Sequence, residues 1–258
     1  MARTALAALC VLMVTCSAVA GEPARGRVTG VIDGDTVVLE NGREVRLVGI
    51  QAPKLPLGRK NFTPWPLADA AKQALEDLAL GREVTLAYGG RRVDRHDRLL
   101  AHVTVAEPDG TTLWLQGALL EQGMARVYSF ADNRWRIAEM LALERAARAA
   151  ERGIWDDRFY QVRDVDQIER DIGSFQLVEG RVLAVAEVRG RVYLNFGPDW
   201  RSDFTVTLKP AVRRKFEAEG IAPKAYQDRW VRVRGWLKSF NGPMIEVTHP
   251  EQIEVLEP

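Results

Sequence analysis

Four short segments carry side chains that could bind and polarise a phosphate group. An acidic turn, Asp33-Gly34-Asp35, separates two β-branched runs, and Arg46 lies in the run that follows. Gln51-Ala52-Pro53-Lys54 and the basic segment that ends in Arg98 come later. Arginine suits phosphate because its planar guanidinium pairs with two oxygens at once and stays charged. The arginines and Lys54 could thus contact a phosphate, but these segments alone do not say which of them does so.

In their order and spacing these segments closely resemble the staphylococcal nuclease (thermonuclease) family. Val45-Arg46-Leu47-Val48-Gly49-Ile50 and a terminal Gly153-Ile154-Trp155 complete the resemblance, which covers about residues 27–157. It implies an OB-like five-stranded barrel with three helices that cleaves DNA and RNA phosphodiesters with a calcium ion. Asp35 then matches the first acidic calcium ligand. Arg46 and Arg98 match the arginines that grip the phosphate and stabilise its charge in the transition state.

Two positions depart from the pattern that the family typically has, Asp-(Thr or Ala)-Pro-Glu. Gln51 stands where the resemblance places a second acidic calcium ligand, and calcium affinity follows the charge of the ligands. Lys54 stands where the resemblance places the glutamate that activates water. An ammonium cannot take a proton from water at its ordinary pKa, and its positive charge repels a nearby metal ion. The catalytic set by resemblance is thus Arg46 and Arg98, with Gln51 and Lys54 as departures. In this context Arg46, Arg98 and Lys54 are candidate phosphate contacts that together could clamp one anion. We expect calcium binding to be weak or absent.

Each candidate also has a simpler interpretation. Arg46 could pair with a nearby acid, and Lys54 could be a solvated loop charge. Asp97 could pair with Arg98 and weaken the clamp, or supply a replacement acid. His96 stands where the family often carries a residue that touches the nucleotide, but a single histidine is more often a surface residue. Asp33 and Asp94 are expected to hold turns.

The elements that position these residues follow from local patterns. β-Branched runs predict strands at residues 27–32, 36–39 and 44–48, with Asn41-Gly42 as a hairpin turn. Four prolines make residues 51–67 a loop. Apolar spacing predicts helices at residues 66–80, 113–122 and 132–152, with further strands at 83–88 and 99–105.

A second segment follows an expected linker at residues 158–173. Strands at 177–188, 191–196 and 203–208, a helix at 211–219, and strands at 230–237 and 244–247 have the order of an OB barrel. Arg191 and Tyr193 share one face of a strand, as do Arg232 and Arg234 in a later strand. Basic and aromatic residues interleaved in this way are typical of a surface that binds single-stranded nucleic acid. A plain barrel whose arginines pair with acids is the alternative.

Residues 1–20 have the pattern of a secretory signal: Arg3, an apolar stretch, and Ala18-Val19-Ala20 before Gly21. An N-terminal helix packed on the body is one alternative, and a lipoprotein acylated at Cys16 is a second. Both cysteines, Cys10 and Cys16, lie in this segment, so a mature chain could form no disulfide. We therefore expect a periplasmic or secreted protein, with no transmembrane segment in the mature chain.

The charge balance excludes binding of nucleic acid by bulk charge. The chain has 36 Lys and Arg against 35 Asp and Glu, so any anion must be held by a few placed residues. The fold class expected is mainly β with α (α+β): a signal at 1–20, a thermonuclease-like barrel at 21–157, and an OB-like barrel at 174–258. Three functions remain open: a phosphate- or nucleic-acid-binding protein with impaired hydrolysis, acting on single strands or nucleotides; an active metal-dependent nuclease; and a non-catalytic envelope interaction module.

Overall fold

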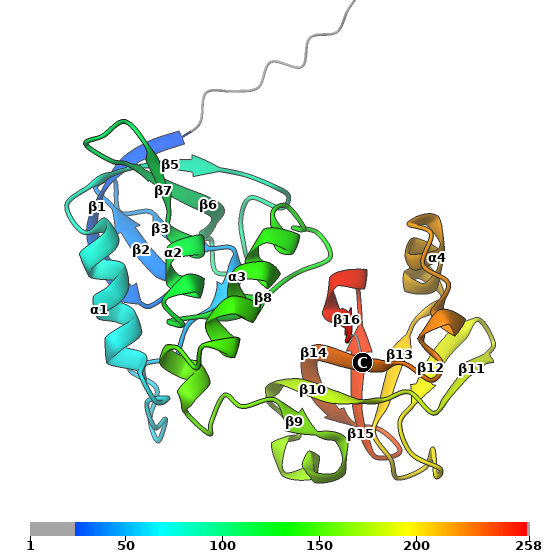
Figure 1. Ribbon diagram of the computed structural model, residues 1–258. Helices are drawn as coiled ribbons and strands as arrows, with labels where there is room; N and C mark the ends of the chain where they lie inside the picture. Colours follow the sequence, from blue (N-terminus) through cyan, green and yellow to red (C-terminus); the bar gives the residue numbers. More distant parts are fainter. Residues whose placement is uncertain (1–23, 257–258) are drawn as a thin grey trace, which may run out of the picture.

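Five strands close into the first barrel of the computed structural model, which describes residues 24–256 (Figure 1). The strands run in the order β3-β2-β1-β5-β6, and parallel pairing of β3 with β6 closes the barrel. Their bounds are Ala24–Asp33 (β1), Thr36–Leu39 (β2), Glu44–Leu47 (β3), Glu83–Ala87 (β5) and Leu99–Ala106 (β6). This is an OB-type barrel, as the resemblance to the nuclease family implies.

Alternating side chains build its core. Val28, Val37, Val45 and Leu47 are fully buried inside the barrel, because successive residues of a strand face opposite sides. The predicted Asn41-Gly42 hairpin is confirmed: Gly42 has a φ of +77°, which glycine adopts without the steric cost other residues bear.

Three helices cover the barrel: α1 (Ala68–Ala79), α2 (Leu115–Glu121) and α3 (Ile137–Ala149). The predicted helix at 113–122 is wrong at its start, because Leu113 belongs to the short strand β7 (Thr112–Trp114), which pairs with β6. The predicted helix at 132–152 is too long. It begins only after Arg136, whose φ of +60° is incompatible with a continuing helix.

A small separate sheet, not predicted, carries the start of the loop after β3. Strand β4 (Gly49–Gln51) pairs antiparallel with β8 (Arg126–Tyr128), which sets Gln51 opposite Arg126. Gly49 makes this turn with a φ of +87°, and a Cβ there would lie 2.5 Å from the end of Met140. Two three-residue strands are too short to show a period in the sequence.

The second barrel repeats the connectivity of the first. Its order is β11-β12-β13-β15-β14-β10, with β13 and β15 parallel, and the chain bends from β10 into β11 to close it. Helix α4 (Pro210–Ala218) lies between β13 and β14 in the chain, as α1 lies between β3 and β5. The strand bounds are Phe175–Arg181 (β10), Ala184–Val188 (β11), Arg191–Asn195 (β12), Thr205–Leu208 (β13), Trp230–Ser239 (β14) and Pro243–Val247 (β15).

Part of the expected linker belongs to the second barrel. Strand β9 (Arg163–Asp164) pairs in parallel with β10, and Ile168 is buried in the second core. A further strand, β16 (Ile253–Val255), pairs with β14. No helix within residues 24–256 combines the length and hydropathy needed to cross a bilayer. The signal-like segment at residues 1–20, with Cys10 and Cys16, lies outside the described residues.

The two barrels share packing and ion pairs. Ala147 of α3 and Phe175 of β10 belong to one apolar cluster. Glu144 of α3 pairs with Arg234 of β14, and Arg145 pairs with Glu254 of β16. Figure 1 shows α3 facing β14 and β16 across this seam.

Candidate active site

The acidic turn between β1 and β2 lies under the loop that follows β4. Asp35 is fully buried and Asp33 nearly so. Gly34 allows the turn to pack closely, because a Cβ there would lie 2.8 Å from the Cβ atoms of both Ala52 and Ala71. Asp33 accepts a hydrogen bond from the backbone N–H of Asp35, which confirms its expected role in the turn. The turn thus places two carboxylates close together.

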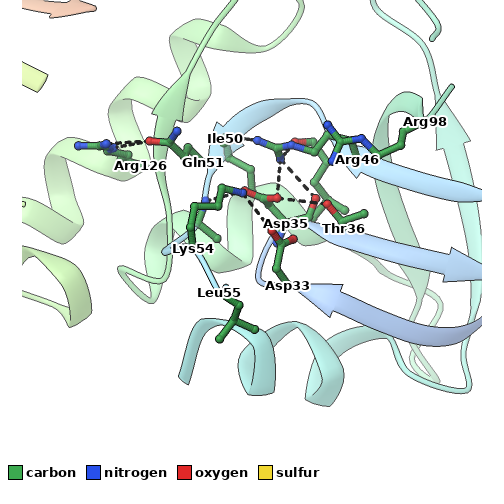
Figure 2. Close-up of polar contacts among 12 residues, drawn as sticks. Asp33, Asp35, Thr36, Arg46, Ile50, Gln51, Lys54, Leu55, Arg98 and Arg126 are labelled. Carbon is green, nitrogen blue, oxygen red and sulfur yellow. Dashed lines mark hydrogen bonds and ion pairs between the residues drawn. The ribbon is translucent and has the colours of Figure 1, made fainter. Parts of the chain in front are cut away.

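Lys54 bridges both carboxylates (Figure 2). Its Nζ lies 2.6 Å from Oδ2 of Asp35 and 3.1 Å from Oδ2 of Asp33. Asp35 Oδ2 also accepts the backbone N–H of Ala52 at 2.8 Å. The sequence suggested either a solvated loop charge or a phosphate contact for Lys54, and neither interpretation includes these ion pairs. The ammonium lies where a cation bound to the two aspartates would lie.

Arg46 is turned inward on the same acid. Its Nη1 lies 3.1 Å from Oδ1 of Asp35, and its two terminal nitrogens donate to the backbone carbonyls of Asp35, Leu47 and Ile50. Its side chain is 12% exposed. Arg46 therefore pairs with a nearby acid, and a phosphate would have to compete with that acid for the guanidinium.

The pKa values of the two aspartates move in opposite directions. Burial alone would raise the pKa of Asp35, but Arg46 and Lys54 outweigh it and hold that pKa far below its ordinary value. The pKa of Asp33 is raised, first by burial and then by the charge of Asp35, against the lowering effect of Lys54. Asp35 is thus a fixed anion, and Asp33 is the carboxyl of the pair that takes up a proton more readily.

Gln51 points away from this cluster (Figure 2). Its Oε1 accepts hydrogen bonds from Nε and Nη2 of Arg126 at 2.9 and 2.7 Å. Arg126 is buried, and burial lowers its pKa to about 10. Its guanidinium also lies 4.9 Å from the ring centre of Phe175. The amide oxygen of Gln51 is therefore used by Arg126 and does not face Asp35.

Arg98 lies near this cluster but pairs with a different acid. Asp94 accepts from its Nε at 2.8 Å and lies 2.7 Å from its Nη2. Asp94 also accepts the backbone N–H groups of His96 and Arg98, as expected for a turn residue. From the sequence, Asp97 was a candidate ion-pair partner of Arg98, but the acid that pairs with Arg98 is Asp94. Asp97 lies 3.9 Å from Arg43 and is largely exposed.

One cleft of about 880 Å³ brings the candidates together. Arg46, Gln51, Lys54, His96 and Arg98 line it, and Asp35 lies beneath. The wall also carries basic and aromatic residues that the sequence reasoning missed: Arg59, Phe62, Trp65, Arg91, Arg95, Tyr128, Phe130 and Trp236. Six Lys and Arg residues and three Asp residues line the cleft, so it is locally basic although the chain is nearly neutral.

The residues present do not fit a calcium ion. Calcium takes six to eight oxygen ligands, and this cluster offers two carboxylates whose facing oxygens already bind Lys54. Among residues 24–256, no three His, Cys, Asp or Glu side chains are grouped in a way that could hold a metal. No chemical step through calcium follows from this arrangement.

The candidate nucleic-acid surface of the second barrel is only partly where the sequence placed it. Arg234 is wrong for such a surface, because it is fully buried in the seam against Glu144 and Glu254. Arg232 pairs with Glu179, and Arg191 lies 3.5 Å from Glu246. Tyr193 lines a separate pocket with Trp200 and Phe240. Arginines paired with acids are what the alternative, a plain barrel, predicts.

Comparison with known proteins identifies the family of this chain. The family model described as "Staphylococcal nuclease homologue" matches residues 44–157. "Protein ParB" of Escherichia coli is 36% identical over 160 residues, which cover 59% of this chain and 83% of that protein. The chain belongs to the staphylococcal nuclease homologue family. An "Uncharacterized endonuclease" of Escherichia coli O157:H7 is 31% identical over 136 residues, which cover 51% of this chain and 77% of that protein.

Most residues that line the cleft lie within the part of the chain that the family model matches. Asp35, Arg46 and Lys54 come together there, while Gln51 and Arg98 are held by Arg126 and Asp94. The family match ends at residue 157, so Trp236 reaches the cleft from outside it. No local signal marks Trp236, since its contact with the first barrel is made 108 residues away, at Tyr128.

Proposed function

We propose that this chain binds nucleic acid through its phosphates and that calcium-dependent hydrolysis is impaired. The single observation that carries the proposal is the ammonium of Lys54, 2.6 Å from Asp35 and 3.1 Å from Asp33. A calcium ion at the same carboxylates would have to displace a cation covalently tied to the site. At about 5 Å and an effective dielectric of about 20, Lys54 would also repel the ion by about 7 kcal/mol.

Binding of phosphate is supported by the arginines at the mouth of the cleft. Arg91 and Arg95 are exposed, and among the described residues neither forms an ion pair; Arg91 donates to the carbonyl of Val93 and Arg95 to His96. Arg98 is part-exposed and held by one carboxylate. A single part-buried ion pair contributes modest free energy, so Arg98 could exchange Asp94 for a phosphate.

The family's water-activating position offers no base. Lys54 is an ammonium there, and His96 already accepts a hydrogen bond from Arg95 through Nε2. We therefore expect the purified chain to bind a labelled single-stranded oligonucleotide in EDTA, with an affinity that falls steeply with salt. We expect no products after incubation with millimolar calcium. Turnover that EDTA abolishes would overturn the impaired-hydrolysis part of the proposal.

A reverse substitution tests the role of Lys54. Lys54→Glu places a third carboxylate beside Asp33 and Asp35, so calcium should raise the melting temperature of this variant and leave that of the wild type unchanged. Lys54→Gln is the control, because it removes the ammonium without adding an acid. Adding Gln51→Asp should contribute little, since Arg126 will hold the new carboxylate. Equal calcium responses of Lys54→Glu and Lys54→Gln would contradict this reading.

Active hydrolysis is the second candidate, and one observation favours it. Asp33 lines the cleft with a raised pKa, as a general acid or base requires. Turnover that persists in EDTA and is lost in Asp33→Asn, with binding retained, would favour this candidate.

Export is a further part of the proposal. The signal-like residues 1–20 support a periplasmic or secreted location, and the N-terminal sequence of the chain recovered from its host should then begin at Gly21. A chain recovered from the cytoplasm that still begins at Met1 would contradict export.

A further inference from the structure

The cleft crosses the seam between the two barrels. Trp236, on β14 of the second barrel, lines the same cavity as Lys54 and Arg98 of the first. Its Nε1 donates a hydrogen bond of 2.8 Å to the hydroxyl of Tyr128, on β8. The second barrel therefore supplies part of the wall of the candidate site.

Two aromatic rings on this wall are half exposed. Trp236 is 47% exposed and Phe130 is 43% exposed, although both are large apolar side chains beside a cleft. The ring of Tyr128 lies between them. It packs edge-on against Phe130 with ring centres 5.0 Å apart, and it holds Trp236 through its hydroxyl. Tyr128 thus contacts both residues, and the three side chains form one aromatic cluster on the wall of the cleft.

The aromatic cluster shares the cleft with positive charge. Arg91, Arg95 and Arg98 line the same cleft, and the first two are free of acids among the described residues. A basic track beside exposed aromatic rings is the chemistry that holds a single strand: cations follow the phosphates while unpaired bases stack on the rings. A duplex keeps its bases stacked on each other and cannot use such rings.

We propose that Trp236 and Phe130 form a base-stacking platform for single-stranded nucleic acid, so that the second barrel is part of the binding site. This rests on the proposed function of the cleft. The platform adds to the phosphate contacts a preference for single strands over duplex. It also explains why a large indole stays exposed at a seam where neighbouring residues of β14, such as Arg234, are fully buried.

The test uses the full chain and fluorescence anisotropy of labelled 12-nucleotide oligo-dT and oligo-U in EDTA. Because Trp236→Ala removes one stacking ring, it should raise the Kd about tenfold, which corresponds to about 1.4 kcal/mol, for both strands. Trp230→Ala is the matched control, since Trp230 lies on the same strand at 53% exposure and does not line the cleft. It should bind as the wild type does. A DNA duplex of equal length should bind the wild type more weakly than oligo-dT does. Because a duplex cannot stack on the ring, it should bind Trp236→Ala as tightly as it binds the wild type.

Two conservative variants separate stacking from a structural role. Trp236→Phe keeps an aromatic face but loses the hydrogen bond, and Tyr128→Phe loses the same hydrogen bond from the other side. Both should bind within about threefold of the wild type. If Tyr128→Phe weakens binding as much as Trp236→Ala does, the hydrogen bond is what matters and the platform is refuted.

The outcomes distinguish the platform from the proposed function. Wild-type binding with unchanged affinity in Trp236→Ala would overturn the platform and leave the proposed function standing. No binding by the wild type would overturn both. If Trp236→Ala does not fold, quenching of tryptophan fluorescence by unlabelled oligo-dT tests the platform instead. The quenching should be smaller in Trp236→Phe than in the wild type. Equal quenching would refute the platform.

Discussion

Replacing Lys54 by methionine should destabilise the protein because it leaves two buried carboxylates facing each other. The contacts of Nζ with Asp35 at 2.6 Å and Asp33 at 3.1 Å correspond to about 6 and about 5 kcal/mol of attraction at an effective dielectric of about 20. Desolvation of the ammonium offsets much of this, and removal of one partner from buried ion pairs typically costs about 3–5 kcal/mol. Since Lys54 is 20% exposed, we expect a loss near the lower end, about 3 kcal/mol at pH 7.

The loss should shrink in acid. Without Lys54, the folded protein can relieve the repulsion by protonating Asp33, whose pKa is already raised above 3.8 by burial and by Asp35. A raised carboxyl pKa means that the folded state binds the proton more tightly, so stability falls as pH rises between 3.8 and the folded pKa. Each unit by which the pH falls lowers the cost of taking up that proton by about 1.4 kcal/mol, so protonation of Asp33 is easier at pH 5 than at pH 7. The difference between variant and wild type should therefore be smaller at pH 5.

Thermal unfolding followed by circular dichroism measures both effects. A loss of about 3 kcal/mol corresponds to a melting temperature lowered by about 6–12 °C in a protein of this size. Lys72→Met is the control, because Lys72 pairs with Glu76 on the exposed face of α1, where ion pairs contribute less than about 1 kcal/mol. A melting temperature within 2 °C of the wild type at pH 7, or a difference as large at pH 5 as at pH 7, would refute the bridging role of Lys54.

Two further predictions concern the mouth of the cleft and the seam. Arg95→Ala should weaken binding of single strands of any sequence and reduce the slope of log Kd against log salt by about one, as loss of one phosphate contact does; an unchanged slope would remove Arg95 from the phosphate track. Glu144→Gln should cost about 3 kcal/mol in urea denaturation, because it takes one carboxylate from the buried Arg234, while a loss below 1 kcal/mol would mean that Glu254 alone satisfies that arginine.

Much of the fold follows from local patterns and family resemblance. Alternation and the Asn41-Gly42 turn locate the strands of the first barrel, and the order of strands and helix predicts the second. What local patterns miss are elements too short to show a period, such as β4 and β8, and helix starts set by a single residue such as Arg136.

The site was predictable in its members and less so in their partners. The sequence identifies Asp35, Arg46 and Lys54, and the structure brings them into contact. The partner of Gln51 lies 75 residues away at Arg126, and that of Arg234 lies 90 residues away at Glu144. Strand alternation puts Arg234 beside Arg232 on one face, but only the position of α3 decides which of them is buried. Long-range pairing of this kind leaves no trace in a local pattern.

The most direct test of whether Lys54 takes the place of the metal is a titration of the purified chain with a labelled single-stranded oligonucleotide. The titration is run in EDTA and in millimolar calcium, and each sample is then analysed on a gel. If Lys54 takes the place of the metal, the two binding curves should coincide and the oligonucleotide should remain intact in both. Cleavage in calcium that disappears in EDTA would contradict this central claim.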